Sequence, residues 1–538
     1  YAPVTGYLTL NQGNTGLEDS LNDYLSGTSN NQFFDQVNAI VTGQKPKGAS
    51  VELTIDPVVQ QAAWDALGDY KGAVIAIRPK TGEIIAMVSK PTFDPNLFAV
   101  HDSAQVIDTY DQLLNDPSGP LFNRTLAGAL DPPGSTFKLV VASAAIDSGS
   151  FTADSAFPNP ALLTLPQSSF QISNSDEAPC GPGDTVTIAT AVRLSCNIPM
   201  AELGQQLGYR AILEQANKFG FNESIDVPLT STASVYPRVL DEPSTMLSAF
   251  GQSEVRASPL QMAMVSMAIA NGGTIMKPNL VESILSSNLN SIEQFTPAEF
   301  RRAMSEQTAA TMTGLMVSSV ANGAANTATI DGVDVAGKTG TTNDVVDMWF
   351  VGSTPTLTSA VWMGNDDNKS MPYWAYSGDF MPQIWSDVVG NALTGTPRGS
   401  WREPKYIAYR DTLGVKMAYS WQREDIQTTA IQAASSPPPE EDALVRRPEV
   451  QQLPSDGAAR VVIAVDTCIS NAASVNPRAD EFTEPRCIEN QSVRASDLEF
   501  YDPKWQPPQP SPAPPQPIAP EPPPFNPDPD PIQPPSNP

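Results

Sequence analysis

Histidine is nearly absent from this chain, which has one, His101, among 538 residues. A Ser-His-Asp triad would have to use His101 as its base, and a zinc site would find no second imidazole. His101 lies in a polar segment between proline-containing turns, which is typical of a surface loop. Mechanisms that need two histidines are therefore excluded.

Cysteine is scarce as well, with four residues whose spacings match neither a CxxC pair nor a zinc ribbon. A dense disulfide framework is excluded. Cys468 and Cys487 are close enough in sequence to close a small loop, and we predict a disulfide there in an oxidising compartment. Two buried thiols are the alternative. Cys180 and Cys196 could form a second pair.

Positively charged residues are far fewer than negatively charged ones, and long apolar runs are absent from the sequence. The 31 Lys and Arg residues stand against 59 Asp and Glu residues, a formal net charge of −28. Phosphate backbones and anionic lipids repel such a protein, so we expect no nucleic-acid partner. There is no run of about 18 apolar residues, and the start at Tyr1 carries neither an initiator Met nor a charged leader. We expect a freely soluble protein or the trimmed part of one anchored upstream.

Composition divides the chain into four parts. Residues 1–49 are rich in Asn, Gly, Ser and Thr and are interpreted as an accessory segment, whereas residues 50–400 have the apolar patterning of a folded domain. Residues 401–505 are interpreted as a linker and a small C-terminal unit. Residues 506–538 are about half proline and are expected to form a disordered tail, because they have too few apolar side chains for a core.

The pattern of the central domain predicts strands at its two ends and helices between them. Asp56 is placed to cap a helix over residues 57–67, and residues 79–82 have the chemistry of a hairpin turn. Strand-like runs cover residues 51–55, 72–78, 83–89, 333–336, 345–352 and 359–364. Helical patterns cover residues 135–147, 186–194, 199–207, 210–219, 259–270 and 308–320. This order predicts an α+β fold with one antiparallel sheet covered by helices on its faces.

Three short motifs follow one another along this domain: STFK at 135–138, SCN at 195–197 and KTGT at 338–341. Each is weak alone, because such patterns occur by chance in a chain of this length. On a helix, Ser135 and Lys138 share a face, so the lysine amine can reach the serine hydroxyl. This pairs a nucleophile with a base that is not histidine.

An ordinary lysine, with a pKa near about 10.4, is a poor base at neutral pH. The site must therefore lower the pKa of Lys138 by desolvation or by a neighbouring cation, for which Lys338 is the candidate. The helix N-terminus at Ser135 would also offer backbone N–H groups and the positive end of the helix dipole to an oxyanion.

The other two motifs supply groups that suit a peptide substrate. The Ser195 hydroxyl and the Asn197 amide can relay protons and hold a peptide. Lys338, with the hydroxyls of Thr339 and Thr341, offers a cation and donors to a terminal carboxylate. We therefore predict acyl transfer from a peptide that ends in a free carboxylate, with no metal and no cofactor.

Residues 332–339 also fit the phosphate-binding pattern GxxxxGK[ST]. A P-loop should run from a buried strand into a helix, yet the residues after Thr339 are turn formers followed by a strand-like run. Three of the intervening residues are apolar. This context argues against phosphate binding.

The three motifs resemble those of the penicilloyl serine transferases, the superfamily of penicillin-binding proteins and serine β-lactamases. Asn123–Thr125 and Gly251-Gln252 are similar to family sequence as well, and the resemblance covers most of residues 50–400. It implies a β-lactamase/transpeptidase-like fold and a D,D-transpeptidase that cross-links peptidoglycan stem peptides and is inhibited by β-lactams.

The resemblance also implies roles. Ser135 would be acylated, Lys138 would be the base, and the backbone N–H groups of Ser135 and Thr341 would form the oxyanion hole. The other positions that match the motifs are Ser195 and Asn197 in the second motif and Lys338, Thr339, Gly340 and Thr341 along the substrate strand.

The resemblance changes character along the chain. Up to about Lys338 the chain is similar to monofunctional class B enzymes of actinobacteria, and beyond it to bifunctional class A enzymes. The 49 residues before Ser50 are too few for a glycosyltransferase module, so a separate glycosyltransferase is expected as a partner. A transmembrane helix before Tyr1 is also implied, with the catalytic domain on the extracytoplasmic face.

Three alternatives stay open. A D,D-carboxypeptidase would hydrolyse the acyl-enzyme instead of transferring it. A serine β-lactamase would be much shorter and would present a glutamate for deacylation, which no local motif after Asn197 provides. A β-lactam sensor or wall-binding scaffold would bind stem peptides without cleaving them.

Overall fold

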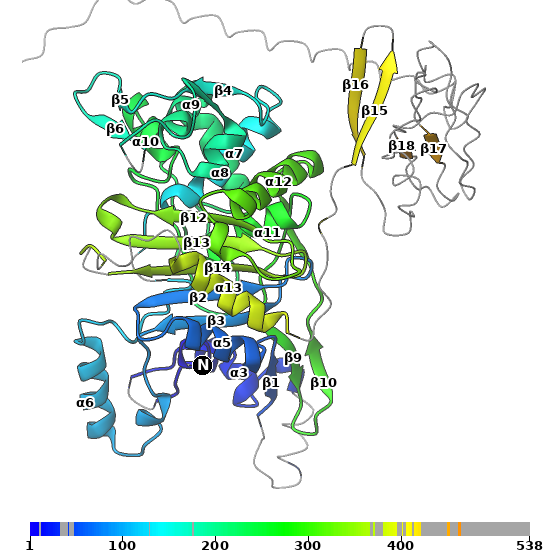
Figure 1. Cartoon of the computed structure of the whole chain (residues 1–538). Helices are drawn as coiled ribbons and strands as arrows, with labels where there is room; N and C mark the ends of the chain where they lie inside the picture. The colour runs from blue at the N-terminus through cyan, green and yellow to red at the C-terminus, as the bar shows by residue number, and fades with distance from the viewer. Residues whose placement is uncertain are drawn as a thin grey trace, which may run out of the picture. The chain divides into compact units, whose positions relative to one another are not determined.

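A computed structural model of the chain describes residues 1–9, 12–32, 41, 48–127, 130–174, 177–365, 369–371, 380–394 and 401, and four strands beyond them. The chain divides into two units, Tyr1–Pro404 and Lys405–Pro538 (Figure 1). In the second unit, β15 (Lys405–Asp411) pairs with β16 (Gly414–Ser420), and β17 (Glu449–Gln451) with β18 (Val461–Ile463). The predicted Cys468–Cys487 disulfide lies outside the described residues.

The first unit is built around a five-stranded antiparallel sheet of order β12-β13-β14-β2-β3. Its strands are β2 (Gly72–Ile77), β3 (Ile84–Lys90), β12 (Ala336–Thr341), β13 (Asp347–Ser353) and β14 (Thr358–Gly364). Strands from the two ends of the domain meet where β14 pairs with β2, with Thr358 opposite Ile77. The predicted antiparallel sheet is confirmed.

Helices cover both faces of this sheet, and alternate side chains of each strand enter different cores. On β13, Trp349 and Val351 join the core formed with α7, α9, α11 and α12, whereas Met348 and Phe350 join the core formed with α5 and α13 (Figure 1). Because β2, β3, β13 and β14 are buried on both faces, these four strands appear in the sequence as largely apolar runs. Burying one such side chain contributes about 1.5–3 kcal/mol.

The helices that form these layers lie mostly between the two groups of strands. They are α5 (Pro57–Ala66), α6 (Ser103–Leu114), α7 (Lys138–Asp147), α8 (Ile188–Leu194), α9 (Ile198–Phe219), α10 (Glu242–Ser248), α11 (Pro259–Ala270), α12 (Glu306–Asn322) and α13 (Phe380–Ala392). Residues Pro259 to Ile269 of α11 are all buried, as expected for a helix that is apolar on every side. Among the described residues, no helix is long and apolar enough to span a membrane.

The remaining elements are short. Three small helices, α1 (Ala2–Thr5), α2 (Gly16–Ser20) and α3 (Asn22–Leu25), form the N-terminal segment. The small sheets comprise β1 (Ser50–Leu53), β9 (Val281–Leu285) and β10 (Ser291–Gln294); β8 (Thr274–Met276) and β11 (Glu299–Arg302); β4 (Ala156–Pro158) and β7 (Thr185–Thr187); and β5 (Leu162–Thr164) and β6 (Gln171–Ser173).

Predictions that depend on neighbouring residues are confirmed. The Asp56 carboxylate accepts hydrogen bonds from the backbone N–H groups of Val58 and Val59, at 2.8 and 3.4 Å, and so caps α5. Strands β2 and β3 form the expected hairpin. In each case the residues that carry the sequence pattern lie within a few residues of the cap or turn that they predict.

Near the motifs, one predicted helix is confirmed with a different first turn, and the start of one predicted strand is wrong. The helix expected from Ser135 opens with a 3₁₀ turn, Gly134–Phe137, and becomes α-helical at Lys138. The strand expected over residues 333–336 begins at Ala336 and runs to Thr341, after a tight turn that contains an isolated Ile330–Val333 bridge. The KTGT motif therefore lies within the strand, although its glycine lowers strand propensity.

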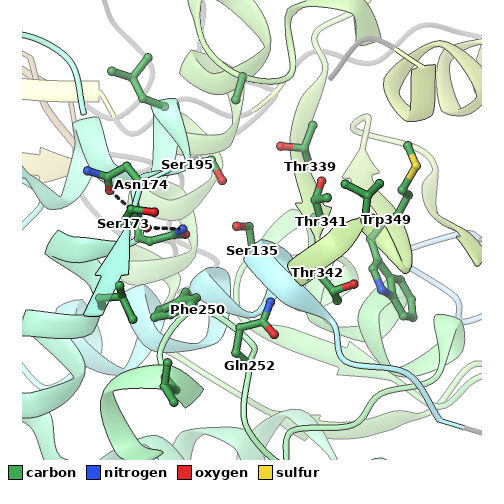
Figure 2. Close-up of a pocket in the computed structure, with 18 of the residues that line it drawn as sticks. Ser135, Ser173, Asn174, Ser195, Phe250, Gln252, Thr339, Thr341, Thr342 and Trp349 are labelled. Atoms are coloured by element: carbon green, nitrogen blue, oxygen red, sulfur yellow. Dashed lines mark hydrogen bonds between the residues drawn. The ribbon is translucent and has the colours of Figure 1, made fainter. Parts of the chain in front are cut away.

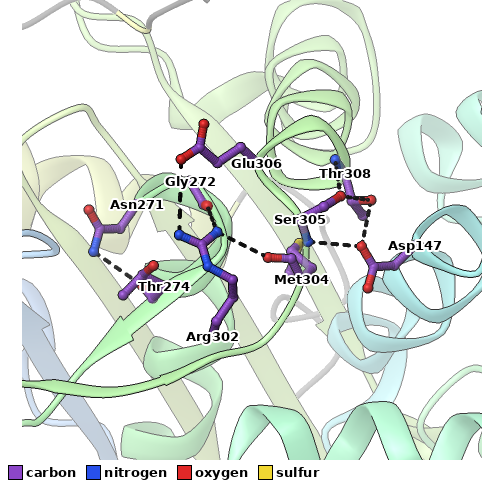
Figure 3. Close-up of polar contacts among 9 residues, drawn as sticks. All are labelled: Asp147, Asn271, Gly272, Thr274, Arg302, Met304, Ser305, Glu306 and Thr308. Carbon is purple, nitrogen blue, oxygen red and sulfur yellow. Dashed lines mark hydrogen bonds and ion pairs between the residues drawn. The ribbon is translucent and has the colours of Figure 1, made fainter. Parts of the chain in front are cut away.

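A carboxylate joins the end of α7 to the start of α12 (Figure 3). Asp147, the last residue of α7, accepts hydrogen bonds from the Ser305 backbone N–H at 2.9 Å and the Thr308 hydroxyl at 2.8 Å. Ser305 caps α12 by accepting from the Thr308 backbone N–H at 3.1 Å. Beside it, Arg302 donates to the carbonyl of Gly272 at 3.0 Å. The negative charge of Asp147 also suits the positive end of the α12 dipole.

We expect Asp147→Ala to lower the free energy of unfolding by about 1–2 kcal/mol, because it removes two hydrogen bonds and a favourable charge from the start of α12. Chemical denaturation measures the effect. Asp108→Ala is the control, because it removes an exposed helix carboxylate with no hydrogen bond in the described part of the chain. Equal stability of the two variants would contradict the capping role.

Candidate active site

The nucleophile candidate Ser135 lies on a turn that only glycine can precede. Gly134 has a φ of 51° and donates its N–H to the carbonyl of Gly251 at 3.1 Å. A Cβ on Gly134 would lie 2.7 Å from the carbonyl oxygen of Thr341, so the turn rests directly on the KTGT strand. Ser135 is partly exposed and lines a pocket of about 700 Å³ (Figure 2).

The second motif is placed by a break between two helices. Ser195 ends α8 in the left-handed conformation, with a φ of 63°, and Asn197 precedes α9. The left-handed conformation is uncommon outside glycine and is found where surrounding contacts enforce it. It allows the carbonyl and the hydroxyl of Ser195 to be reached by the same buried amine, that of Lys138.

Asn174 holds this motif from the other side and was not predicted. Its side-chain oxygen accepts hydrogen bonds from the backbone N–H groups of Asn197 and Ile198, at 2.9 and 3.2 Å. The Asn197 amide in turn donates to the carbonyl of Ser173 at 3.0 Å. The segment of β6 therefore fixes the orientation of Asn197, so that the side-chain oxygen of Asn197 can accept from Lys138.

A disulfide between Cys180 and Cys196 adds a covalent connection to this motif. The sequence left this pair open. Cys196 is 1% exposed and lies between Ser195 and Asn197, so its sulfur points into the protein while the two motif side chains stay near the pocket. Asn159 further holds the partner residue by accepting from the Cys180 backbone N–H at 2.8 Å.

Two lysines from different motifs meet at Ser195. Lys138 donates to the Ser195 carbonyl at 2.6 Å, to the Asn197 side-chain oxygen at 2.8 Å and, at 3.4 Å, to the Ser195 hydroxyl. Lys338 donates to the same hydroxyl at 2.7 Å and to the Thr339 carbonyl at 2.9 Å. The structure thus connects all three motifs, and Ser195 lies between the two amines.

Both lysines are fully buried, and this changes their acidity. Burial is the main cause that holds the pKa of Lys138 well below its ordinary value, and the charge of Lys338 adds to it. Burial lowers the pKa of Lys338 to about 7. The predicted depression of the Lys138 pKa, with Lys338 as the neighbouring cation, agrees with this arrangement. A neutral Lys138 could accept a proton from a nearby hydroxyl.

The KTGT strand, β12, lies at the edge of the sheet with one side open to the pocket. The Thr342 N–H bonds to the carbonyl of Asp347, and backbone groups alternate in direction along a strand. The N–H and C=O groups of Thr341 and Thr339 therefore point away from β13, toward the pocket. An exposed strand edge of this kind can pair with an extended peptide, although the Thr339 carbonyl already accepts from the Lys338 amine at 2.9 Å.

The pocket has two polar walls with Ser135 between them (Figure 2). Ser173, Asn174 and Ser195 form one wall, and the KTGT threonines the other. Further lining residues that the motifs did not indicate are Phe170, Phe250, Gln252, Thr342 and Trp349. All five lie outside the three motifs, although Gln252, Thr342 and Trp349 lie in stretches that are similar to family sequence.

The described residues contain no group of three or more side chains suited to hold a metal ion. The pocket itself offers hydroxyls, buried amines and backbone N–H groups. These are donors and proton carriers, which suit attack on a carbonyl and stabilisation of the resulting oxyanion.

Comparison with known protein families gives two matches. The model described as "Penicillin binding protein transpeptidase domain" matches residues 72–379. The model described as "Penicillin binding protein A dimerisation domain" matches residues 1–51. The first match contains all three motifs, and it covers more than half of the chain.

Curated relatives and solved structures agree with these matches. The chain is 39% identical to the peptidoglycan D,D-transpeptidase PbpA of Mycolicibacterium smegmatis, over 66% of this chain and 74% of that protein. It is 34% identical to PbpA of Mycobacterium tuberculosis, over 74% of this chain and 83% of that protein. The imipenem acyl-enzyme structure of penicillin-binding protein A from M. tuberculosis has a TM-score of 0.69 at 34% identity, covering 73% of this chain and 91% of that one.

Replacing Cys180 and Cys196 together with serine should lower the free energy of unfolding by about 3 kcal/mol, since the bond closes a loop of this size in the unfolded chain. Guanidinium denaturation measures it. Alkylation of the unreduced wild type, followed by peptide mapping, is the control and should leave both cysteines unlabelled. Labelling of Cys180 in native, unreduced protein would contradict the disulfide.

The rate of acylation by a carboxylate-bearing β-lactam should fall as the pH rises above about 7, because Lys338, whose pKa is about 7, then loses the charge that attracts the carboxylate. Because its pKa is lowered, Lys138 becomes protonated and stops serving as a base only at lower pH. Stopped-flow measurement of the second-order acylation constant gives the profile.

Lys338→Arg is the matched variant, because arginine stays protonated across this range. Its acylation should be slower overall but should no longer decline above pH 7. A decline of equal steepness in the variant would assign the titration to another group.

Proposed function

The chain belongs to the penicillin-binding protein transpeptidase family and is a peptidoglycan D,D-transpeptidase, and we propose that Ser135 is the residue that forms its acyl-enzyme. The observation that carries this assignment is the meeting of two buried lysines at Ser195, beside a serine that is presented to the pocket.

In the first half-reaction, the Ser135 oxygen attacks the carbonyl carbon of the penultimate D-Ala of a stem peptide, and Lys138 accepts the hydroxyl proton. The negative charge that develops on the carbonyl oxygen is taken by the backbone N–H groups of Ser135 and Thr341. The C–N bond then breaks, the terminal D-Ala nitrogen receives the proton through Ser195, and an ester remains on Ser135.

In the second half-reaction, an amine from another stem peptide attacks the ester carbonyl. Its excess proton returns through Lys138 to the Ser135 oxygen as the ester bond breaks, so the enzyme is restored and a new amide is formed. During the first half-reaction, Lys338, Thr339 and Thr341 hold the terminal carboxylate of the first peptide. A β-lactam follows the first half-reaction, but its leaving nitrogen stays tethered to the acyl group and the ester persists.

Asn197 has a supporting role in this proposal. Its oxygen accepts from the Lys138 amine at 2.8 Å, and its own orientation is set by Ser173 and Asn174. It therefore aims the amine of Lys138 and can also face the peptide backbone of the substrate. Gly340 contributes by its lack of a side chain, since a Cβ would lie 2.9 Å from the Pro133 carbonyl oxygen.

The domain limits 1–49, 50–400, 401–505 and 506–538 are part of the proposal. The family matches at residues 1–51 and 72–379 and the division of the chain after Pro404 support them. Cross-linking also requires a polymerised glycan, so we propose that a glycosyltransferase supplies the substrate.

The family acts in cell-wall synthesis, and we propose that this chain works at the extracytoplasmic face, anchored by a transmembrane helix before Tyr1. The Cys180–Cys196 disulfide supports this location, because disulfides persist in oxidising compartments.

Incubation with benzylpenicillin should produce a stable adduct on Ser135 that intact-protein mass spectrometry detects, and Ser135→Ala should show none. Ser143→Ala is the control, since Ser143 is fully buried on α7 and away from the pocket lining. With a stem-peptide analogue and an acceptor amine, wild type should form the cross-linked product. Hydrolysis alone would identify a D,D-carboxypeptidase, and rapid release of opened penicillin would identify a β-lactamase.

A further inference from the structure

Three segments of the chain converge at Gly340 with no space between them. A Cβ on Gly340 would lie 2.8 Å from the Thr136 methyl group, 2.9 Å from the Pro133 carbonyl oxygen and 2.9 Å from the Trp349 Cβ. Thr136 and Pro133 belong to the turn that carries Ser135, and Trp349 belongs to β13. The nucleophile turn, the KTGT strand and the neighbouring strand are therefore in direct contact.

Trp349 is placed to hold this junction together. It lies directly opposite Gly340 in the β12–β13 pairing, so its side chain emerges on the same face of the sheet as the missing side chain of Gly340. From there its indole N–H donates to the carbonyl of Pro132 at 2.9 Å. Trp349 is fully buried, although its atoms help to line the pocket (Figure 2).

The segment that receives this hydrogen bond is held by backbone bonds on either side but has few donors of its own. Asp131 and Ala257 exchange backbone hydrogen bonds at 3.4 and 2.9 Å, and the Gly134 N–H donates to the Gly251 carbonyl at 3.1 Å. Pro132 and Pro133 have no N–H to donate, and the Pro133 carbonyl is already occupied by the Thr136 hydroxyl at 2.6 Å. The next residue, Gly134, rests against the backbone of Thr341. A shift of this segment would therefore move Ser135 relative to Thr341.

We propose that Trp349 is a positioning residue for the oxyanion hole. Through β13 it holds the strand that carries the Thr341 N–H, and through its indole N–H it holds the turn that carries the Ser135 N–H. One side chain thus connects the two parts that carry these amides, in addition to the backbone contacts at Gly134 and Gly340. This inference rests on the proposed function, because it takes these two N–H groups as the oxyanion hole.

The size of the effect follows from what the two amides do. Removing one oxyanion-hole donor slows an enzyme by roughly 100- to 1,000-fold, and a displacement of about 1 Å at a reacting centre can cost about 100-fold. Loss of the Trp349 hydrogen bond leaves both donors present but less well aligned. We expect acylation to slow by about 10- to 100-fold.

The test is Trp349→Phe, which keeps an aromatic ring and removes the N–H. Trp385→Phe is a matched control, because Trp385 is also fully buried and its indole N–H also donates to a backbone carbonyl, that of Ser359, at 3.1 Å. Trp385 belongs to the core on the opposite face of the sheet. Both variants should lose similar stability, whereas only Trp349→Phe should show slower acylation by benzylpenicillin.

An infrared measurement separates positioning from general destabilisation. Hydrogen bonds in the oxyanion hole weaken the C=O bond of the acyl-enzyme ester and lower its stretching frequency. The ester band of the penicilloyl adduct, identified with ¹³C-labelled penicillin, should lie at higher wavenumber in Trp349→Phe than in wild type and be unchanged in Trp385→Phe. An unchanged band and rate in Trp349→Phe would overturn the proposal.

If Trp349→Phe does not fold, incorporation of 3-benzothienylalanine at position 349 replaces the indole N–H by sulfur in a side chain of nearly the same shape, and the same two measurements apply. The proposed function fails separately: without an adduct on Ser135 in the wild type, there is no ester band to compare. An adduct that forms in wild type and is insensitive to position 349 would reject only the role of Trp349.

Discussion

The burial of two lysine amines within reach of one serine is the constraint on which the rest of the site depends. Lys138 and Lys338 are both fully buried, and both donate to the Ser195 hydroxyl, at 3.4 and 2.7 Å. Two adjacent ammonium groups in such surroundings would be strongly unfavourable. The pair is tolerated because oxygen acceptors surround each amine and because Lys138 readily gives up its proton. Burial of the two amines, which is unfavourable in itself, thus also provides the base.

The surrounding fold fixes the positions of these groups relative to one another. The sheet has a core on each face, so the edge strand β12 is supported by β13 and by helices, while its other edge stays open to the pocket. The nucleophile turn approaches this strand at Gly134 and Gly340, where side chains would collide. Close packing of backbone on backbone gives a fixed geometry without the rotamer freedom of long side chains.

The second motif is held in a different way, by links from a segment that precedes it. Asn174 accepts from two backbone N–H groups at the start of α9, and the Cys180–Cys196 bond fixes the residue between Ser195 and Asn197. A buried, fully bonded amide and a disulfide both resist displacement. The three motifs therefore meet at one point although each is supported by separate contacts.

Much of this protein was determined by residues close together in the sequence. The cap at Asp56 and the β2–β3 hairpin follow from spacings of a few residues, and the apolar runs predicted the sheet. What only the tertiary structure decided joins distant residues: Lys138 to Ser195 across 57 positions, Lys338 to Ser195 across 143, and Trp349 to Pro132 across 217. Burial and long-range contacts of this kind set the proton affinity of the lysines. They also set the role of Asn174 and the hydrogen bond from Trp349 to Pro132. Local sequence patterns do not predict these properties, because desolvation and packing exist only once the chain has folded.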